Sequence, residues 1–96
     1  MGAKVARGEN LRCGVKIRNF SKVLVNATAI DLTISDKNGV TIVTKTLLDI
    51  VQLGTGLYAY DYTPASDALL GTNCALWDVT YSTLHRKARG YFTVVA

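Results

Sequence analysis

Side chains that could act as acids, bases or nucleophiles are few and widely spaced in this chain of 96 residues. The only histidine, His85, is followed directly by Arg86 and Lys87. Acid–base or nucleophilic catalysis needs a base within hydrogen-bond reach of a nucleophile, and a third group that orients the base. The aspartates that could orient a base occur singly along the chain. The sequence therefore predicts a protein that is not an enzyme, with His85 in an exposed loop.

Motifs that hold metal ions or phosphates are incomplete. Residues 36–39 (DKNG) match part of a calcium loop, but no bidentate glutamate follows, and Glu9 is the only glutamate in the chain. A hairpin turn explains these four residues. The glycines at residues 54–56 (GTG) are not followed by the lysine of a phosphate-binding loop. The two cysteines, Cys13 and Cys74, do not form a CxxC pair. We therefore expect no metal site and no cofactor.

Positive charge gathers in two parts of the sequence, within residues 1–22 and within residues 85–89, and the formal net charge is +4. Such clusters can attract an acidic partner surface or nucleic acid, but a solvated positive rim is the simpler interpretation, and we do not expect nucleic acid. The candidate partner-binding residues are the cations of these clusters and one apolar residue expected on an outer sheet face: Lys4, Arg7, Arg12, Lys16, Arg18, Leu76, Arg86, Lys87 and Arg89.

Alternating apolar and polar residues predict the elements that position these side chains. Strands are expected over residues 11–18 and 30–35, and the Asn-Gly pair at 38–39 predicts a hairpin turn before a strand over 40–46. Further expected elements are strands over 57–63, 73–81 and 90–95, an irregular strand over 47–53, a turn over 54–56, a loop or single helical turn over 65–71 and a connecting loop over 82–89. About seven short strands favour an all-β, two-sheet sandwich, with a small barrel as the alternative.

Three tyrosines, Tyr58, Tyr60 and Tyr62, alternate along one expected strand. A solvent-facing row of aromatic rings can stack nucleic-acid bases. In that orientation, however, Asp61 would face the core, and burying an unpaired carboxylate is costly. The pattern therefore favours tyrosines that face the core, with their hydroxyl groups reaching the sheet edge.

Three stretches of the chain are similar to immunoglobulin-like modules. They are residues 56–64 (GLYAYDYTP), followed by Gly71 and a strand containing Trp77; residues 30–39 (IDLTISDKNG); and residues 91–94 (YFTV). Together they resemble Ig-like modules of tailed-phage virions and of prokaryotic surface proteins, and also the filamin repeat, whose G-x-Y…Y-x-P stretch precedes its last two strands. The resemblance covers about residues 8–95 and implies an Ig-like sandwich, a fold that hosts many unrelated functions.

By this resemblance, residues 11–18 form the B strand and residues 73–81 form the F strand. Cys13 is in phase with the inward residues of its strand, whereas Cys74 is out of phase with the expected inward residues Ala75, Trp77, Val79 and Tyr81. A disulfide between the sheets needs both thiols inside. We therefore expect Cys13 to be a small buried side chain, Cys74 to face outward beside Leu76, and the two cysteines not to be bridged.

The resemblance and the lack of catalytic groups imply a non-catalytic virion structural protein: a capsid-decorating, head–tail or tail-surface module acting through protein–protein contacts. The alternative is an Ig-like module of a larger prokaryotic cell-surface or adhesin protein that binds a protein or glycan. We expect a basic N-terminal segment over residues 1–8 and one domain over residues 9–96. We expect no signal peptide and no membrane insertion. The expected partners are other virion or surface proteins, with a second copy of the chain as a further option, and the expected location is the virion, assembled in the host cytoplasm, or the cell surface.

Overall fold

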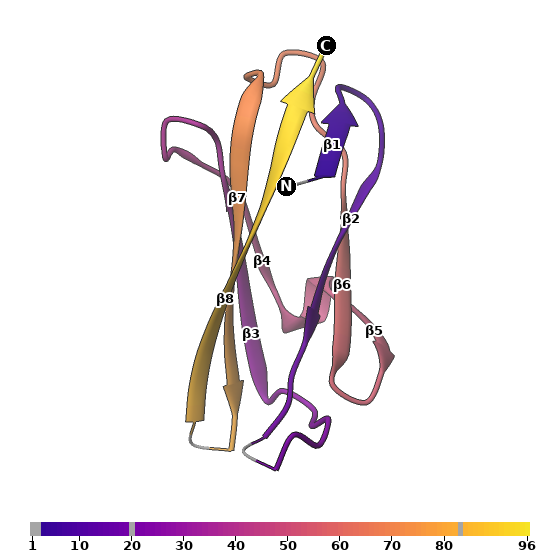
Figure 1. Cartoon of the computed structure of the whole chain (residues 1–96), viewed down its shortest axis with the longest axis vertical. Coiled ribbons are helices and arrows are strands. Elements are labelled where there is room, and N and C mark those ends of the chain that lie inside the picture. The colour runs from indigo at the N-terminus through magenta and orange to yellow at the C-terminus, as the bar shows by residue number, and fades with distance from the viewer. Residues whose placement is uncertain (1–2, 20, 83) are drawn as a thin grey trace.

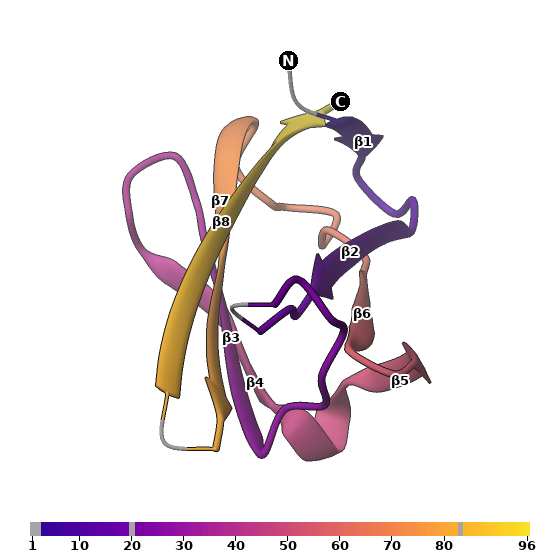
Figure 2. The same ribbon diagram turned by 60° about the horizontal axis from the view of Figure 1, so that its bottom comes forward.

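The computed structural model describes residues 3–19, 21–82 and 84–96, and these residues form two β-sheets that face each other (Figures 1 and 2). The larger sheet has the strand order β1-β8-β7-β3-β4, and the smaller sheet has the order β2-β6-β5. The strands are β1 Ala3–Ala6, β2 Leu11–Lys16, β3 Ala29–Ser35, β4 Thr41–Thr46, β5 Val51–Gly54, β6 Leu57–Tyr62, β7 Gly71–Tyr81 and β8 Leu84–Val95. The predicted all-β, two-sheet fold is confirmed, with eight strands in the described part of the chain instead of about seven.

The core lies between the inner faces of the two sheets. Ile30, Leu32 and Ile34 alternate along β3 and are at most 1% exposed. Alternate residues of β7, from Asn73 to Tyr81, are also buried. The smaller sheet adds these buried side chains from β2 and β6: Cys13, Tyr58 and Tyr62, with Ile17 just after β2. Burial of apolar side chains of this size contributes about 1.5–3 kcal/mol each, which makes this layer the main source of stability.

The tyrosine row of β6 faces the core, as predicted. Tyr58 and Tyr62 are buried, and Tyr60 is half-buried against the same cluster. The hydroxyl group of Tyr58 accepts a hydrogen bond from the backbone N–H of Ala27 at 3.0 Å, so its polar end reaches the loop between β2 and β3. Asp61, in the opposite phase, is exposed. The rings therefore pack toward the core and do not form a solvent-facing row.

The connecting loop predicted over residues 82–89 is wrong, because most of this stretch belongs to β8. Strands β7 and β8 pair from Gly71↔Val94 to Tyr81↔Leu84, so they form one long hairpin. The residue that follows β7, Ser82, has φ 55°. The first part of β8 is exposed on both faces, and its sequence therefore lacks the apolar alternation by which the other strands were predicted.

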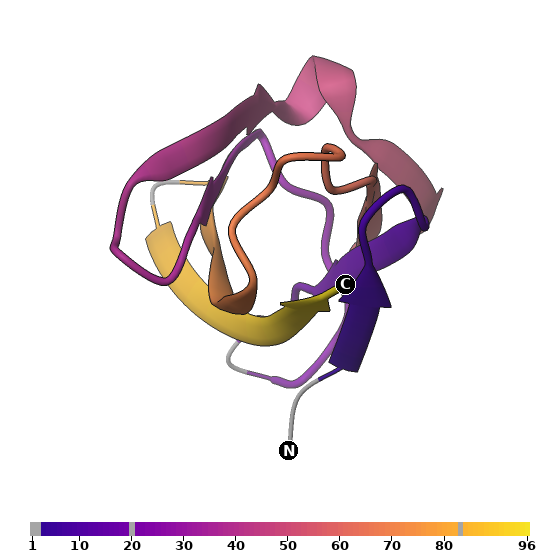
Figure 3. The same ribbon diagram turned by 90° about the horizontal axis from the view of Figure 1, so that it is seen from above.

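The irregular strand predicted over residues 47–53 is partly wrong. Residues Leu47–Asp49 form a short 3-10 helix, η1, and only Val51–Gly54 forms a strand. The Asp49 carboxylate accepts hydrogen bonds from the backbone N–H and the hydroxyl group of Thr46, at 3.2 and 3.3 Å. These bonds close the turn by which the chain leaves β4 and enters β5, crossing from the larger sheet to the smaller one (Figure 3).

Part of the segment predicted as a basic N-terminal extension, residues 1–8, belongs to the larger sheet. Strand β1 runs parallel to the end of β8, with Ala3 opposite Phe92 and Ala6 opposite Val95. Val5 is 3% exposed and joins the core. The backbone N–H of Ala6 donates to the side chain of Glu9 at 2.9 Å, which helps to turn the chain toward β2.

Candidate protein-interaction surfaces

Two of the side chains considered for catalysis or metal binding, His85 and Asp36, make local contacts. His85 lies on exposed strand β8 instead of in a loop, and its Nδ1 is 3.1 Å from the hydroxyl oxygen of Thr80. The Asp36 carboxylate accepts hydrogen bonds from the backbone N–H groups of Asn38 and Val40, which is the hairpin-turn role predicted for it. Within the described residues, no group of three His, Cys, Asp or Glu side chains could hold a metal ion.

The two cysteines are free, as predicted. Cys13 is buried, and Cys74 is half-buried in the opposite phase of β7 from the core residues Ala75 and Trp77. Burial raises the pKa of the Cys13 thiol, and the negative charge of Asp61 adds to this increase. The strand phases read from the sequence therefore account for the unbridged cysteines.

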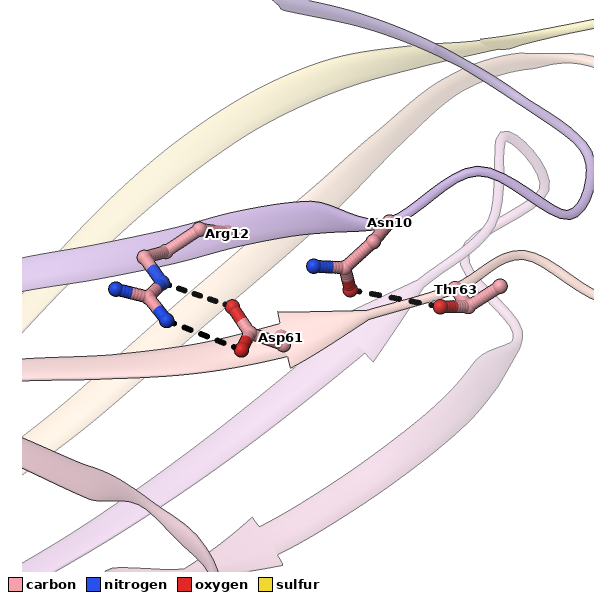
Figure 4. A network of polar contacts seen from close by, with 4 residues as sticks. All are labelled: Asn10, Arg12, Asp61 and Thr63. Carbon is pink, nitrogen blue, oxygen red and sulfur yellow. Dashed lines mark hydrogen bonds and ion pairs between the residues drawn. The ribbon is translucent and has the colours of Figure 1, made fainter.

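Arg12, a candidate partner-binding residue, forms a bidentate ion pair with Asp61 on the outer face of the smaller sheet (Figure 4). The Nε···Oδ1 distance is 2.9 Å and the Nη2···Oδ2 distance is 3.2 Å. The two residues are cross-strand partners of β2 and β6. The hydrogen bonds from Arg12 hold the pKa of the Asp61 carboxyl below its ordinary value, and Asp61 in turn raises the pKa of Arg12. Arg12 is therefore engaged within the sheet.

Two other candidates lie at the N-terminal end. Arg7 donates hydrogen bonds from Nε, at 2.8 Å, and from Nη2 to the backbone carbonyl of Ala68, so it fastens the end of β1 to the loop after β6. Lys4 is exposed and lies opposite Thr93 in the ladder between β1 and β8. Arg7 therefore has a structural role, and Lys4 stays a surface charge.

Two more candidates lie on the larger sheet. Leu76 is half-buried on β7, in the phase that points away from the core, between Thr33 and Arg89. Arg89 is exposed. These two side chains lie on the outer face of the larger sheet, as predicted for Leu76.

The remaining four candidates come together. Lys16 and Arg18 line one groove with Arg86 and Lys87, although about 70 positions separate the two pairs in the sequence. The groove has a volume of about 350 Å³, and its other lining residues are apolar: Val15, Ile17, Val79 and Ala88. It lies where β2, an edge strand of the smaller sheet, meets the part of β8 that β1 does not cover. We call it the β2–β8 groove. The topology thus joins parts of the two basic clusters.

The architecture is similar to two solved structures. The chain aligns with an endo-β-1,4-mannanase from Thermotoga petrophila at a TM-score of 0.66 and 14% identity, over 98% of this chain and 17% of that one. It aligns with the Lin-41 filamin domain at a TM-score of 0.63 and 13% identity, over 96% of this chain and 82% of that one. The fold is an immunoglobulin-like β-sandwich. No protein-family model matches the sequence, and no curated protein has significant sequence similarity to it.

The Ig-like sandwich also carries exposed apolar residues on η1 and β5, which are close in the sequence and were not among the candidates predicted from it. Leu48 of η1 is 97% exposed, and Val51 and Leu53 of β5 are 53% and 54% exposed. Leu53 also lines a shallow pocket with Leu57 of β6 on the smaller sheet. We call these four residues the β5 surface. The prediction of an irregular strand over residues 47–53 assigned no face to Leu48, Val51 or Leu53, which is why the sequence did not reveal them.

No helix in the described ranges of this Ig-like sandwich has the length and apolar character needed to cross a membrane.

Proposed function

We propose that this chain is a non-catalytic module that acts through protein–protein contacts, and that it serves as a structural protein of a tailed-phage virion, in capsid decoration, at the head–tail junction or on the tail surface. The observation that best supports contact with another protein is the β5 surface, where Leu48, Val51 and Leu53 are each more than half exposed. Exposed apolar residues that gather in one place commonly mark interaction sites.

The position of the β5 surface fits contact with a partner. Strand β5 is an edge strand of the smaller sheet, and in the part of the chain that the structure describes it pairs with β6 alone. A free edge beside apolar side chains offers both backbone hydrogen bonds and apolar area to another protein. Covering a leucine side chain contributes about 1.5–3 kcal/mol, so two leucines supply a substantial part of a specific contact.

The test is to purify phage particles from the source cells on a density gradient and to measure the chain in them by mass spectrometry. The wild-type chain should co-purify with the particles. A tagged double variant, Leu48→Ser with Leu53→Ser, should be incorporated at least about tenfold less well, because two exposed apolar contacts are lost. The control is Val40→Ser, which changes a residue that is 57% exposed next to the β3–β4 turn and should leave incorporation unchanged.

The second candidate is an Ig-like module of a larger cell-surface or adhesin protein that binds a protein or glycan. The alignment with the mannanase supports this candidate, because this chain spans 17% of that chain and the fold there is part of a larger protein. The same fractionation separates the two candidates. Recovery of the chain with the cell envelope, and its absence from the gradient-purified particles, would contradict the virion role and favour the surface module.

A further inference from the structure

Strand β8 has a free edge over more than half of its length. Strand β1 pairs only with the stretch from Phe92 to Val95. Residues 84–90 pair with β7 on one side, and no described residue pairs with them on the other. The backbone N–H of Arg7 donates to the carbonyl of Val95, so the peptide groups in phase with Val95 point away from β7. Lys87 and Arg89 share that phase, and their N–H and C=O groups therefore face the free edge.

Strand β2 presents a second free edge across the β2–β8 groove. The backbone N–H of Ile17 donates to the carbonyl of Gly56, so the peptide groups in phase with Ile17 point toward β6. The alternate peptide groups, at Gly14 and Lys16, point away from β6. Among the described residues, strand β2 has no other neighbour in its sheet. Within the described ranges, each wall of the groove thus includes an unpaired strand edge, at Lys16 on one side and at Lys87 on the other, whereas Arg18 forms an isolated bridge with Leu24.

The side chains that line the groove are positively charged or apolar. Of the described residues that line it, four are cations, four are apolar and none is acidic. Val79 is 2% exposed and belongs to the core, whereas Arg86 and Ala88 pair with β7 directly beside it. An occupant that fits this groove needs unpaired backbone groups, small apolar side chains and negative charge.

We propose that the β2–β8 groove binds an extended, acidic segment of a partner protein, which adds as a strand to the free edge of β8 over residues 84–90. In this mode, backbone hydrogen bonds supply affinity, and the side chains on alternate positions supply specificity. Apolar side chains of the segment face Val15 and Ala88, and its carboxylates lie near Lys16, Arg18 and Lys87. The inference rests on the proposed function only in that the partner is a protein.

Charge and composition argue against two other occupants. A second copy of the chain, paired edge to edge through β8, would bring two sets of Lys87 and Arg89 side by side, and like charges at such positions are destabilising. A single-stranded nucleic acid usually stacks its bases on aromatic rings, and none of the described residues that line the groove is aromatic. An acidic peptide strand uses both the charges and the free backbone groups.

The first experiment measures amide hydrogen exchange by NMR on the full chain. The probe is a soluble peptide of about seven residues in which glutamate alternates with valine. At a peptide concentration about ten times the dissociation constant, only about one tenth of the molecules are unbound. Exchange at the Lys87 and Arg89 amides should therefore slow about tenfold. The amides of Arg86 and Ala88 are in the β7–β8 ladder and serve as internal controls. Binding of the peptide without slower exchange at Lys87 and Arg89 would overturn the proposal.

The second experiment separates strand addition from simple charge attraction. A peptide of the same sequence, N-methylated at the alternate positions that face β8, keeps its charges but loses the backbone N–H donors that would bond to β8. It should bind at least about tenfold more weakly than the unmodified peptide. The double variant Lys16→Glu with Arg18→Glu should weaken binding of the unmodified peptide by a similar factor. The control variant Lys4→Glu, outside the groove, should bind as the wild type does. Equal binding of both peptides, or tighter binding of oligothymidylate than of the acidic peptide, would overturn the proposal.

The result of the peptide experiments does not depend on the result of the phage-particle experiment. One outcome is that the chain is absent from the particles while the acidic peptide still slows exchange at the Lys87 and Arg89 amides. In that case the virion role fails and the strand-addition site stands. If particles incorporate the chain and the peptide does not bind, the strand-addition site fails and the virion role stands.

Discussion

At the scale of single residues, the ion pair between Arg12 and Asp61 makes part of the stability depend on pH. Its hydrogen bonds hold the pKa of Asp61 below the ordinary value of 3.8, so the folded chain binds a proton here less readily than the unfolded chain. The stabilising contribution is therefore complete above about pH 4 and is lost as the pH falls through and below 3.8. Because both side chains are exposed, the contribution is small.

The variant Asp61→Asn tests this dependence. Above pH 4 it should be slightly less stable than the wild type, and the difference should shrink as the pH is lowered toward 2, because the wild-type carboxyl becomes protonated. The measurement is urea denaturation at a series of pH values. Arg12→Gln, which removes the other partner of the ion pair, is the control. Its stability difference from the wild type should shrink in the same way as the pH is lowered. A difference that stays constant from pH 7 to pH 2 would show that the ion pair is not its cause.

The two thiols should differ in reactivity. The thiolate is the reactive form, and Cys13 is buried with a raised pKa. Cys74 is half-buried on the outer phase of β7. Brief treatment with iodoacetamide at pH 7.5 should therefore label Cys74 alone, and treatment after denaturation should label both cysteines, as measured by peptide mass spectrometry. Labelling of Cys13 before Cys74 in the folded chain would contradict the burial of Cys13 between the sheets.

At the scale of elements, one glycine fixes the turn between β5 and β6. Gly56 has φ +70°, and a Cβ atom there would lie 2.8 Å from the carbonyl oxygen of Ile17 and 2.9 Å from that of Val25. Its backbone N–H donates to the side chain of Asn26, which also accepts a hydrogen bond from Gln52. The turn is thus packed against the chain that follows β2, and only glycine fits this position without displacing backbone.

The variant Gly56→Ala should lower the free energy of unfolding by about 2 kcal/mol or more, because left-handed strain and a backbone clash act together. The control is Gly39→Ala, in the β3–β4 turn, where φ is +80° but nothing lies within 4 Å of the added Cβ. That variant should lose only about 1 kcal/mol, from strain alone. Chemical denaturation of both variants measures the difference. Equal losses would mean that the contact with Ile17 and Val25 has no energetic effect.

Strands with one buried face could be predicted from apolar alternation, and β4, which has no buried residue, from the Asn-Gly turn before it; strands with neither signal could not be predicted. In β3 and β7, burial alternates along the strand, so apolar residues alternate as well. In the first part of β8 neither face is buried, and the strand exists because β7 supplies its hydrogen bonds. Strand β1 is short, and its single buried residue, Val5, gives no period.

The β2–β8 groove could not be predicted from the sequence for the same reason. The charges of Lys16, Arg18, Arg86 and Lys87 were visible in the sequence, but their convergence depends on β8 extending back to Leu84 beside β2. A loop over residues 82–89 has no free edge to offer a partner. The groove thus became recognisable only through sheet pairing, which joins residues that are distant in the sequence.

At the scale of the whole molecule, the charge on β8 limits self-association. A strand edge with unpaired N–H and C=O groups tends to pair with another copy, and proteins commonly oppose this with charged side chains on the edge. Lys87 and Arg89 are exposed on β8 within the stretch that has no described neighbour on its free side. In this view, the same cations that attract an acidic segment keep two copies of the chain apart.

The double variant Lys87→Thr with Arg89→Thr should therefore dimerise at concentrations at which the wild type stays monomeric, as measured by sedimentation velocity. Threonine keeps the strand propensity of the edge and removes its charge. The control, Lys4→Thr with Lys37→Thr, removes the same amount of charge from outside the free edge and should not dimerise. Raising the salt concentration to 1 M, where charges are screened within about 3 Å, should move the wild type toward the behaviour of the β8 variant. If both double variants dimerise equally, net charge and not the charge on β8 controls association, and the β8 edge is not the contact.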